Sequence, residues 1–139
     1  MRPDHLALGR LITQRLKAEI QDVRNIALRS DLPDLSGQGL VSPSLYVIYV
    51  RDAIPQNGDA PDGMEHLVQQ WMVVLAVQGT PDQLLTTAGD LLAKVREALL
   101  GWSPDPGLYD PIKGATPPAA IYPNGWGFFP LMFNADFYA

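Results

Sequence analysis

Cysteine is absent from the 139 residues of this chain. Its absence excludes a disulfide framework, a thiolate metal site and a cysteine nucleophile. Long apolar runs are also lacking, because the longest, residues 71–77, is far too short to cross a bilayer. The first twenty residues carry charges throughout and do not have the apolar centre of a signal peptide. We therefore expect no membrane partner.

Basic residues are few and unevenly placed. The net charge is −5 and the pI is about 4.7, yet six of the ten basic residues precede residue 30. With three acidic residues among them, the first thirty residues carry +3 and the remainder −8. Arg10, Arg15 and Lys17 could form a basic face toward an acidic partner, and a solvated helix face is the simpler interpretation. Nucleic-acid binding is not expected as the main role at this pI.

Residues 67–102 predict two long elements of the chain, a strand followed by a helix. The run LVQQWMVVLAVQ predicts a strand over residues 67–78 that is apolar on both faces, because successive strand side chains alternate in direction. Next comes an amphipathic helix, in which Thr80, Pro81 and Gln83 form a capping box at the start. Its apolar stripe steps by three and four residues, and Leu85 widens it. Both faces of the strand need cover, from helices or from another subunit.

The remaining elements predict a single α+β domain over residues 1–139, with a mainly antiparallel four-stranded sheet and two helices packed on it. Strands 45–51 and 67–78 should form an antiparallel hairpin. Pro130 lacks an N–H group, which indicates an edge or a bulge in the last strand. The other expected elements are a helix at 3–21, strands at 23–29, 120–122 and 126–138, and Pro/Gly-rich loops at 31–43, 52–65 and 103–119.

Two helices can cover only one face of such a sheet. A partner subunit could cover the second face. Equally, one helix could lie on each face, or a proline-rich loop could fold over the sheet. The residues alone leave these alternatives open.

No arrangement of residues predicts catalysis. His5 and His66 have no carboxylate or hydroxyl at a spacing that suggests a triad, and neither fits a metal-ligand pattern. We expect both to be surface residues. The acids of residues 52–65 do not match a calcium loop, and no glycine pair forms a phosphate cradle. We therefore expect no catalytic residue, cofactor or metal. An enzyme that pairs His66 with loop carboxylates is a third-ranked alternative.

Three segments together resemble the phage tail terminator, or tail completion, family. They are a strand with a tryptophan and valines, a helix with an Ala-Gly pair and an Ala-Leu-x-Gly-Trp end, and a last strand with an aromatic-Pro-Leu-x-Phe pattern. The residues that carry the resemblance are Trp71, Val73, Val77, Ala88, Gly89, Ala98, Leu99, Gly101, Trp102, Phe129, Pro130, Leu131 and Phe133.

This resemblance implies a non-enzymatic subunit of a ring, typically a hexamer, that caps the tail tube. Such a ring stops tube polymerisation and offers a surface for head joining. The implied partners are further copies of the chain, the tail tube protein and a head-tail connector protein, with DNA only as passing cargo. The implied location is the host cytoplasm during assembly and then the virion tail. The residues expected at subunit or tube contacts are Tyr49, Val50, Arg51, Asp59, Asp62, Met72, Pro130 and Asn134.

A different class of function also fits the residues. In a small dimeric ligand-binding or regulatory α+β module, the second sheet face would pair with its twin and a pocket would form between the two copies.

Overall fold

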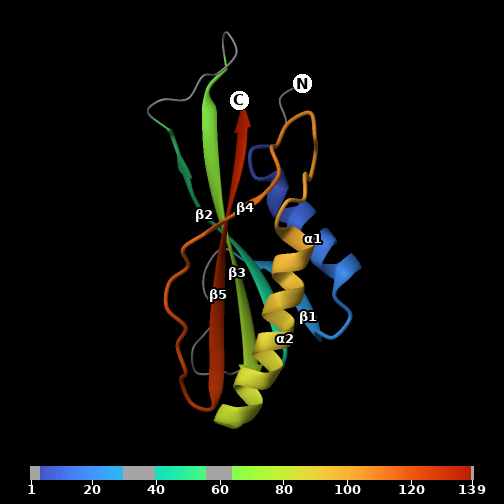
Figure 1. Cartoon of the computed structure of the whole chain (residues 1–139), viewed down its shortest axis with the longest axis vertical. Coiled ribbons are helices and arrows are strands. Elements are labelled where there is room, and N and C mark those ends of the chain that lie inside the picture. Colours follow the sequence, from blue (N-terminus) through green and yellow to red (C-terminus); the bar gives the residue numbers. More distant parts are fainter. Residues whose placement is uncertain (1–3, 30–39, 56–63, 139) are drawn as a thin grey trace.

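The computed structural model describes residues 4–29, 40–55 and 64–138 (Figure 1). These residues form two helices and five strands. In chain order they are α1 (Ala7–Glu19), β1 (Asn25–Arg29), β2 (Ser44–Ala53), β3 (His66–Gln78), α2 (Pro81–Leu99), β4 (Lys113–Ala115) and β5 (Trp126–Tyr138).

All five strands belong to one sheet, in the order β1-β2-β3-β5-β4. Strands β1 and β2 are parallel, and the other neighbours are antiparallel. The α+β class is therefore confirmed, whereas the four-stranded sheet is corrected to a five-stranded mixed one. The added strand, β4, has three residues inside the proline-rich stretch, too few to show any periodicity of its own. The strand expected at 120–122 is a single bridge between Ile121 and Phe128.

The centre of the sheet is the long pair β3 and β5, which are in register from His66 and Tyr138 to Gln78 and Trp126. The predicted hairpin of β2 and β3 is present, and its register shifts at Val50, where a bulge adds one residue. Strand β2 continues to Ala53, beyond the predicted end at Arg51, so the loop between the strands is shorter than expected.

Pro130 lies where a missing N–H group costs no ladder bond. The Phe128 N–H donates to Ile121, away from β3, and the nitrogen of Pro130 faces the same way two residues on. The pairing with β4 spans only residues 132–134 of β5. The side of β5 that faces away from β3 pairs with Ile121 at Phe128 and with β4 at residues 132–134. Pro130 lies between these two places, which agrees with the predicted local edge.

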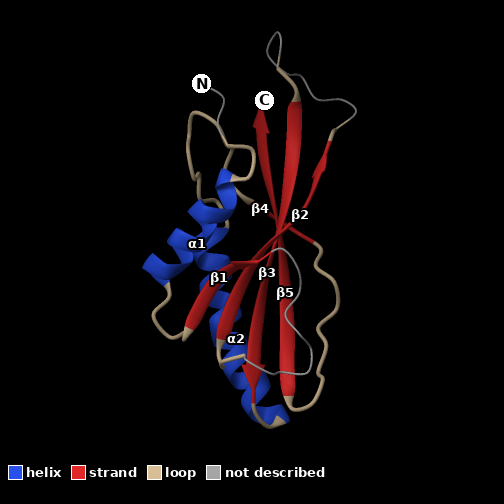
Figure 2. Ribbon diagram, turned by 180° about the vertical axis from the view of Figure 1, so that it is seen from behind, coloured by secondary structure: helices blue, strands red, loops and turns tan. Residues whose placement is uncertain are grey.

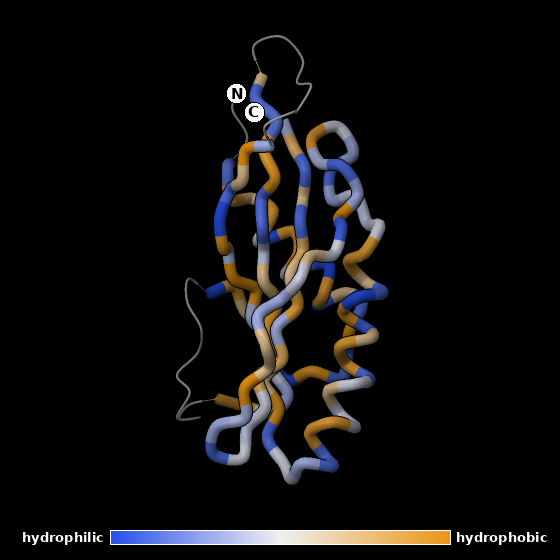
Figure 3. Tube along the Cα trace, turned by 60° about the vertical axis from the view of Figure 1, so that its left-hand side comes forward, coloured by the Kyte–Doolittle hydropathy of each residue, from blue (hydrophilic) through white to orange (hydrophobic). Residues whose placement is uncertain are grey.

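Both helices pack on the same face of the sheet (Figures 1 and 2). The capping box of α2 is present as predicted: Thr80 accepts from the Gln83 N–H, and the Gln83 side chain accepts from the Thr80 N–H. Gly101 ends this helix region with φ +77°, a conformation that glycine adopts without strain. Hydrophobic and hydrophilic positions alternate along α2 (Figure 3), so only one side of the helix enters the core.

The helix-free face of the sheet carries a second apolar cluster, and each of its members is at most 9% exposed. The segment 118–121 lies against it and closes a small cavity of about 60 Å³ with Met72, Val74 and Phe128. A proline-rich stretch folding over the sheet is thus the alternative that the structure favours at this place. The cluster consists of Tyr46, Ile48, Met72, Val74, Ala76, Trp126 and Phe128.

Candidate assembly surfaces

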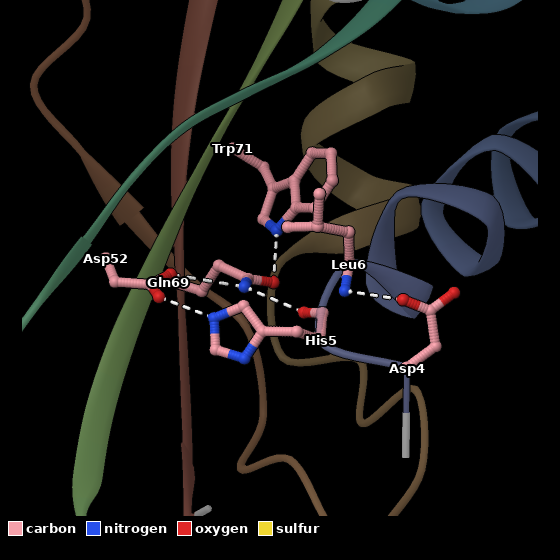
Figure 4. Close-up of polar contacts among 6 residues, drawn as sticks. All are labelled: Asp4, His5, Leu6, Asp52, Gln69 and Trp71. Carbon is pink, nitrogen blue, oxygen red and sulfur yellow. Dashed lines mark hydrogen bonds and ion pairs between the residues drawn. The ribbon is translucent and has the colours of Figure 1, made fainter. Parts of the chain in front are cut away.

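A buried amide joins the N-terminal residues to the sheet (Figure 4). The Gln69 side chain is fully buried on the helix-covered face. Its Oε1 accepts from Trp71 Nε1 at 2.8 Å, and its Nε2 donates to the His5 carbonyl at 3.0 Å and to Asp52 Oδ1 at 3.2 Å. All the polar atoms of this amide therefore have partners, which favours one position for the segment before α1.

Asp52 completes this network. Its Oδ2 lies 2.5 Å from Nε2 of His5, a residue 47 positions earlier in the chain. Burial alone would raise the pKa of Asp52, but hydrogen bonds from His5, Gln69 and Tyr49 outweigh it and lower the pKa. The pKa of Tyr49 is raised, first by burial and then by the hydrogen bond to Asp52. His5 is half-exposed as expected, but its carboxylate partner could not be found from sequence spacing.

His66 is not the surface residue that the sequence suggested. Only 16% of its side chain is exposed, because its ring stacks on Tyr138 at a centroid distance of 5.0 Å. Its Nε2 lies 3.7 Å from Asp136 Oδ2 and has no hydrogen-bond partner in the described part of the chain. His66 does stand beside a carboxylate, as the enzyme alternative required, but that carboxylate belongs to β5 and not to the loop.

These two residues belong to a polar patch on the helix-free face, beyond the apolar cluster. The Asn134 Oδ1 is buried there and accepts no hydrogen bond within the described residues. Lys113 of β4 approaches Asp136 to 3.9 Å. We call this surface, made of His66, Gln70, Lys113, Asn134 and Asp136, the polar patch. The same strands are thus apolar toward the start of α2 and polar toward the end of β5.

A groove opens beside β1 on the helix-covered face. It encloses about 520 Å³, with Trp71 and Tyr49 among its lining residues. Leu6 and Leu28 also line it and are 42% and 45% exposed. Helix α1 packs closely against Trp71 because Gly9 lacks a side chain. A Cβ at Gly9 would lie 2.6 Å from the Trp71 ring. We call this feature the edge groove.

Two strongly exposed apolar side chains lie where α2 begins and in the segment just before β5. Leu85 is 61% exposed and Tyr122 58%, and the two border a second groove of about 400 Å³. The sequence placed Leu85 in the core stripe of the helix, which is wrong. Leu84 is buried, whereas Leu85 points about 100° away from it around the helix axis and is not among the buried residues of α2. We call Leu85 and Tyr122 the apolar ridge.

The three predicted basic residues do not share one surface role. Arg15 docks α1 on α2: its Nε donates to the Ala98 carbonyl at 3.0 Å, and its guanidinium lies 5.4 Å from the Trp102 ring centroid. Arg10 pairs with Asp4 at 2.7 Å at the rim of the edge groove. Lys17 is exposed on the outer side of α1.

The residues predicted at subunit or tube contacts lie in different environments. Tyr49 lines the edge groove, Arg51 is exposed, and Asn134 belongs to the polar patch. Val50 and Pro130 are half-buried, whereas Met72 is only 9% exposed and packs in the apolar cluster. Asp59 and Asp62 lie outside the described residues.

Among residues 4–29, 40–55 and 64–138, no group of three or more His, Cys, Asp or Glu side chains could hold a metal ion. In the same ranges, no helix is both long and apolar enough to span a membrane.

Comparison with known proteins identifies relatives by sequence model and by fold. The family model described as phage tail terminator protein matches residues 1–139. No curated protein sequence matches the chain.

Two solved structures share the fold. One is the sheath/tube terminator, in its extended state, of the extracellular contractile injection system PVC, with TM-score 0.67 and 14% identity. The match covers all of this chain and 57% of that protein, so this chain spans little more than half of its length. The other belongs to the virion of a native gene transfer agent particle, with TM-score 0.65, 16% identity, and coverage of 99% and 100% of the two chains.

Proposed function

Because this chain belongs to the phage tail terminator family, we propose that it caps the phage tail tube as a closed ring of identical subunits. The family is one of structural tail proteins and not of enzymes, so a structural role in the virion tail is its broad function. The ring ends tube polymerisation and presents the surface to which the head is joined. The observation that carries this proposal is the family match over the whole chain.

The ring is a homo-oligomer, with six subunits as the expected number. In a cyclic ring each subunit uses two different patches, and the rotation between them sets the copy number. The other partners are the tail tube protein on one side and a head-tail connector protein on the other. The subunits assemble in the host cytoplasm before they become part of the tail.

The hairpin of β2 and β3, with the local edge at Pro130, is the proposed contact for the tube or a neighbouring subunit. The exposure of its residues supports this proposal. Ile54 and Met64, which flank the hairpin loop, are 62% and 44% exposed, and Arg51, three residues before Ile54, is exposed as well. Exposed apolar side chains at the end of a hairpin are typical of contact sites. The further residues proposed here are Tyr49, Val50, Asp59, Asp62, Met72 and Asn134.

DNA is a passing cargo in this proposal. Of the three basic residues of α1, Lys17 has the exposed position best suited to face DNA or an acidic neighbour. Arg10 and Arg15 already have partners in Asp4 and Glu19.

Electron microscopy of phage lysates tests the proposal. Without the gene product we expect overlong tails that lack heads, because tube growth is not stopped. The wild-type gene supplied in trans should restore tails of normal length with heads attached. Headless tails of normal length, or full virions in its absence, would contradict the capping role.

A matched pair of variants tests the hairpin contact within the same experiment. Arg51→Glu should complement poorly, whereas Arg96→Glu, the same charge reversal at an exposed position of α2, should complement like the wild type. Equal complementation by both variants would remove Arg51 from the contact and leave the capping role in place.

A further inference from the structure

Two exposed apolar features lie at opposite edges of the sheet. The edge groove is beside β1, the first strand in the sheet order. The apolar ridge is formed by the start of α2 and by the segment just before β5, which pairs through Ile121 with the side of β5 that faces away from β3. The edge groove is concave, and Leu85 and Tyr122 are each more than half exposed at the border of the second groove. A monomer gains nothing from such exposure, whereas a contact between copies would bury both.

The charges of the two regions are complementary. Residues 4–29, which include α1 and β1, hold five basic and three acidic residues, a net charge of +2. Residues 64–138 hold three basic and seven acidic residues, a net charge of −4. Locally, Arg10, Arg29 and Asp4 line the edge groove and give it a net charge of +1, while exposed Asp82 lies one helical turn before Leu85. Copies that meet through these two regions attract each other, and copies that meet through the same region repel.

We propose that the apolar ridge of one copy occupies the edge groove of the next copy. This inference rests on the proposed ring and names its subunit contact. Leu85 and Tyr122 would cover Leu6 and Leu28, and would rest on the rings of Tyr49 and Trp71. Because the ridge and the groove are different surfaces, the contact is heterologous and generates a ring when its rotation closes.

The geometry sets one feature of such a ring. The start of α2 lies at the lower end of the molecule, whereas the start of α1, which borders the groove, lies in its upper half (Figure 1). Rotation about the ring axis does not change the height of a residue along that axis. The ridge of one copy can therefore meet the groove of the next only when the long axis of each copy is inclined to the ring axis.

Cysteine cross-linking in full-length protein tests the contact, since the wild-type chain has no cysteine to interfere. We would assemble the double variant Leu28→Cys/Tyr122→Cys with tail tubes and treat it with a short bismaleimide. Denaturing gels should show a ladder that ends at the copy number of the ring. Each single variant should remain monomeric, because in a heterologous contact a residue does not meet its own copy.

The matched control is Val41→Cys/Tyr122→Cys. Val41 is 42% exposed, nearly as much as Leu28, but does not line the edge groove. It should give no ladder.

The possible outcomes separate this contact from the ring itself. Wild-type rings on tube ends with no ladder from the Leu28/Tyr122 pair would overturn the contact and leave the capping proposal intact. Self-linked dimers from Leu28→Cys alone would also overturn it, since they indicate a two-fold interface. Tube ends that carry no ring of the wild-type protein would reject the capping proposal and this inference with it.

Discussion

The two faces of the sheet are covered in different ways. On the helix-covered face, β3 presents Leu67, Gln69, Trp71 and the apolar residues after them, and all are buried under α1, α2 and the segments that flank them. On the helix-free face, the same strand is apolar in one half and enters the polar patch in the other. The covered face stabilises the fold along its whole length, whereas the other face leaves half of its surface for polar contacts.

The hydrogen bonding of two side-chain amides, one on each face, illustrates this difference. Gln69 is buried on the helix-covered face, and each of its polar atoms has a partner. Asn134 lies on the helix-free face, and its Oδ1 is buried without a partner among the described residues. A satisfied buried amide stabilises a fold, while an unsatisfied one destabilises it.

The largest expected effect comes from truncating adjacent residues of β5 that point to opposite faces. Phe133→Ala should lower the free energy of unfolding by about 3–5 kcal/mol, because Phe133 is 1% exposed beneath the helices and leaves a cavity. Met132→Ala should cost about 1 kcal/mol, because Met132 is only half-buried on the other face. Urea unfolding followed by tryptophan fluorescence measures both. Equal losses would show that the two faces contribute alike.

The second comparison exchanges each amide for leucine. Gln69→Leu should lower the free energy of unfolding by about 2 kcal/mol, since Trp71 Nε1 and the His5 carbonyl lose their partners. Asn134→Leu should be neutral or slightly stabilising, because no hydrogen bond to its Oδ1 is lost. Thermal unfolding by circular dichroism gives the two signs. A large loss for Asn134→Leu would mean that this amide is part of the folding core after all.

The smallest expected effect is a pH dependence on the helix-covered side. The pKa of Asp52 in the folded protein is below its ordinary value of 3.8, so the unfolded state takes up the proton first as pH falls. The stabilisation from Asp52 is therefore complete above pH 3.8 and is lost as pH falls through the lower, folded pKa.

Comparison with Asp52→Asn isolates this contribution. Its free energy of unfolding should decline less steeply than that of the wild type in acid, as measured by urea unfolding at stepwise lower pH. Asp105→Asn, at an exposed aspartate outside the network, is the control and should follow the wild type. Identical acid profiles for Asp52→Asn and the wild type would mean that its hydrogen bonds do not stabilise the fold.

Most of the secondary structure could be read from local patterns. The continuous apolar run of β3, the capping box at Thr80 and the lack of an N–H group at Pro130 each act within a few residues, so the sequence shows them directly. The misses occurred where local signal was short or absent. Strand β4 has three residues, and the segment before α1 forms a turn because the Asp4 side chain accepts from the Leu6 N–H.

Much less of the candidate surfaces could be predicted from the sequence. The sequence indicated Tyr49, Arg10 and Asn134, but not that the first two line one groove and the third belongs to a polar patch. Leu85 had the spacing of a residue at the border of the core stripe and is 61% exposed. His5 and Asp52 are 47 residues apart and meet only in the folded chain.

The sequence by itself determined the α+β class, the doubly apolar central strand and the place of both long elements, because hydrophobic periodicity and capping act over short distances. It also carried the family resemblance, which lies in the packing residues of these same elements. Only the tertiary structure decided that both helices share one face, that a proline-rich segment covers part of the other, and that an apolar groove and ridge lie at opposite edges of the sheet. Those features depend on contacts between residues far apart in the chain, and local sequence patterns do not predict such contacts.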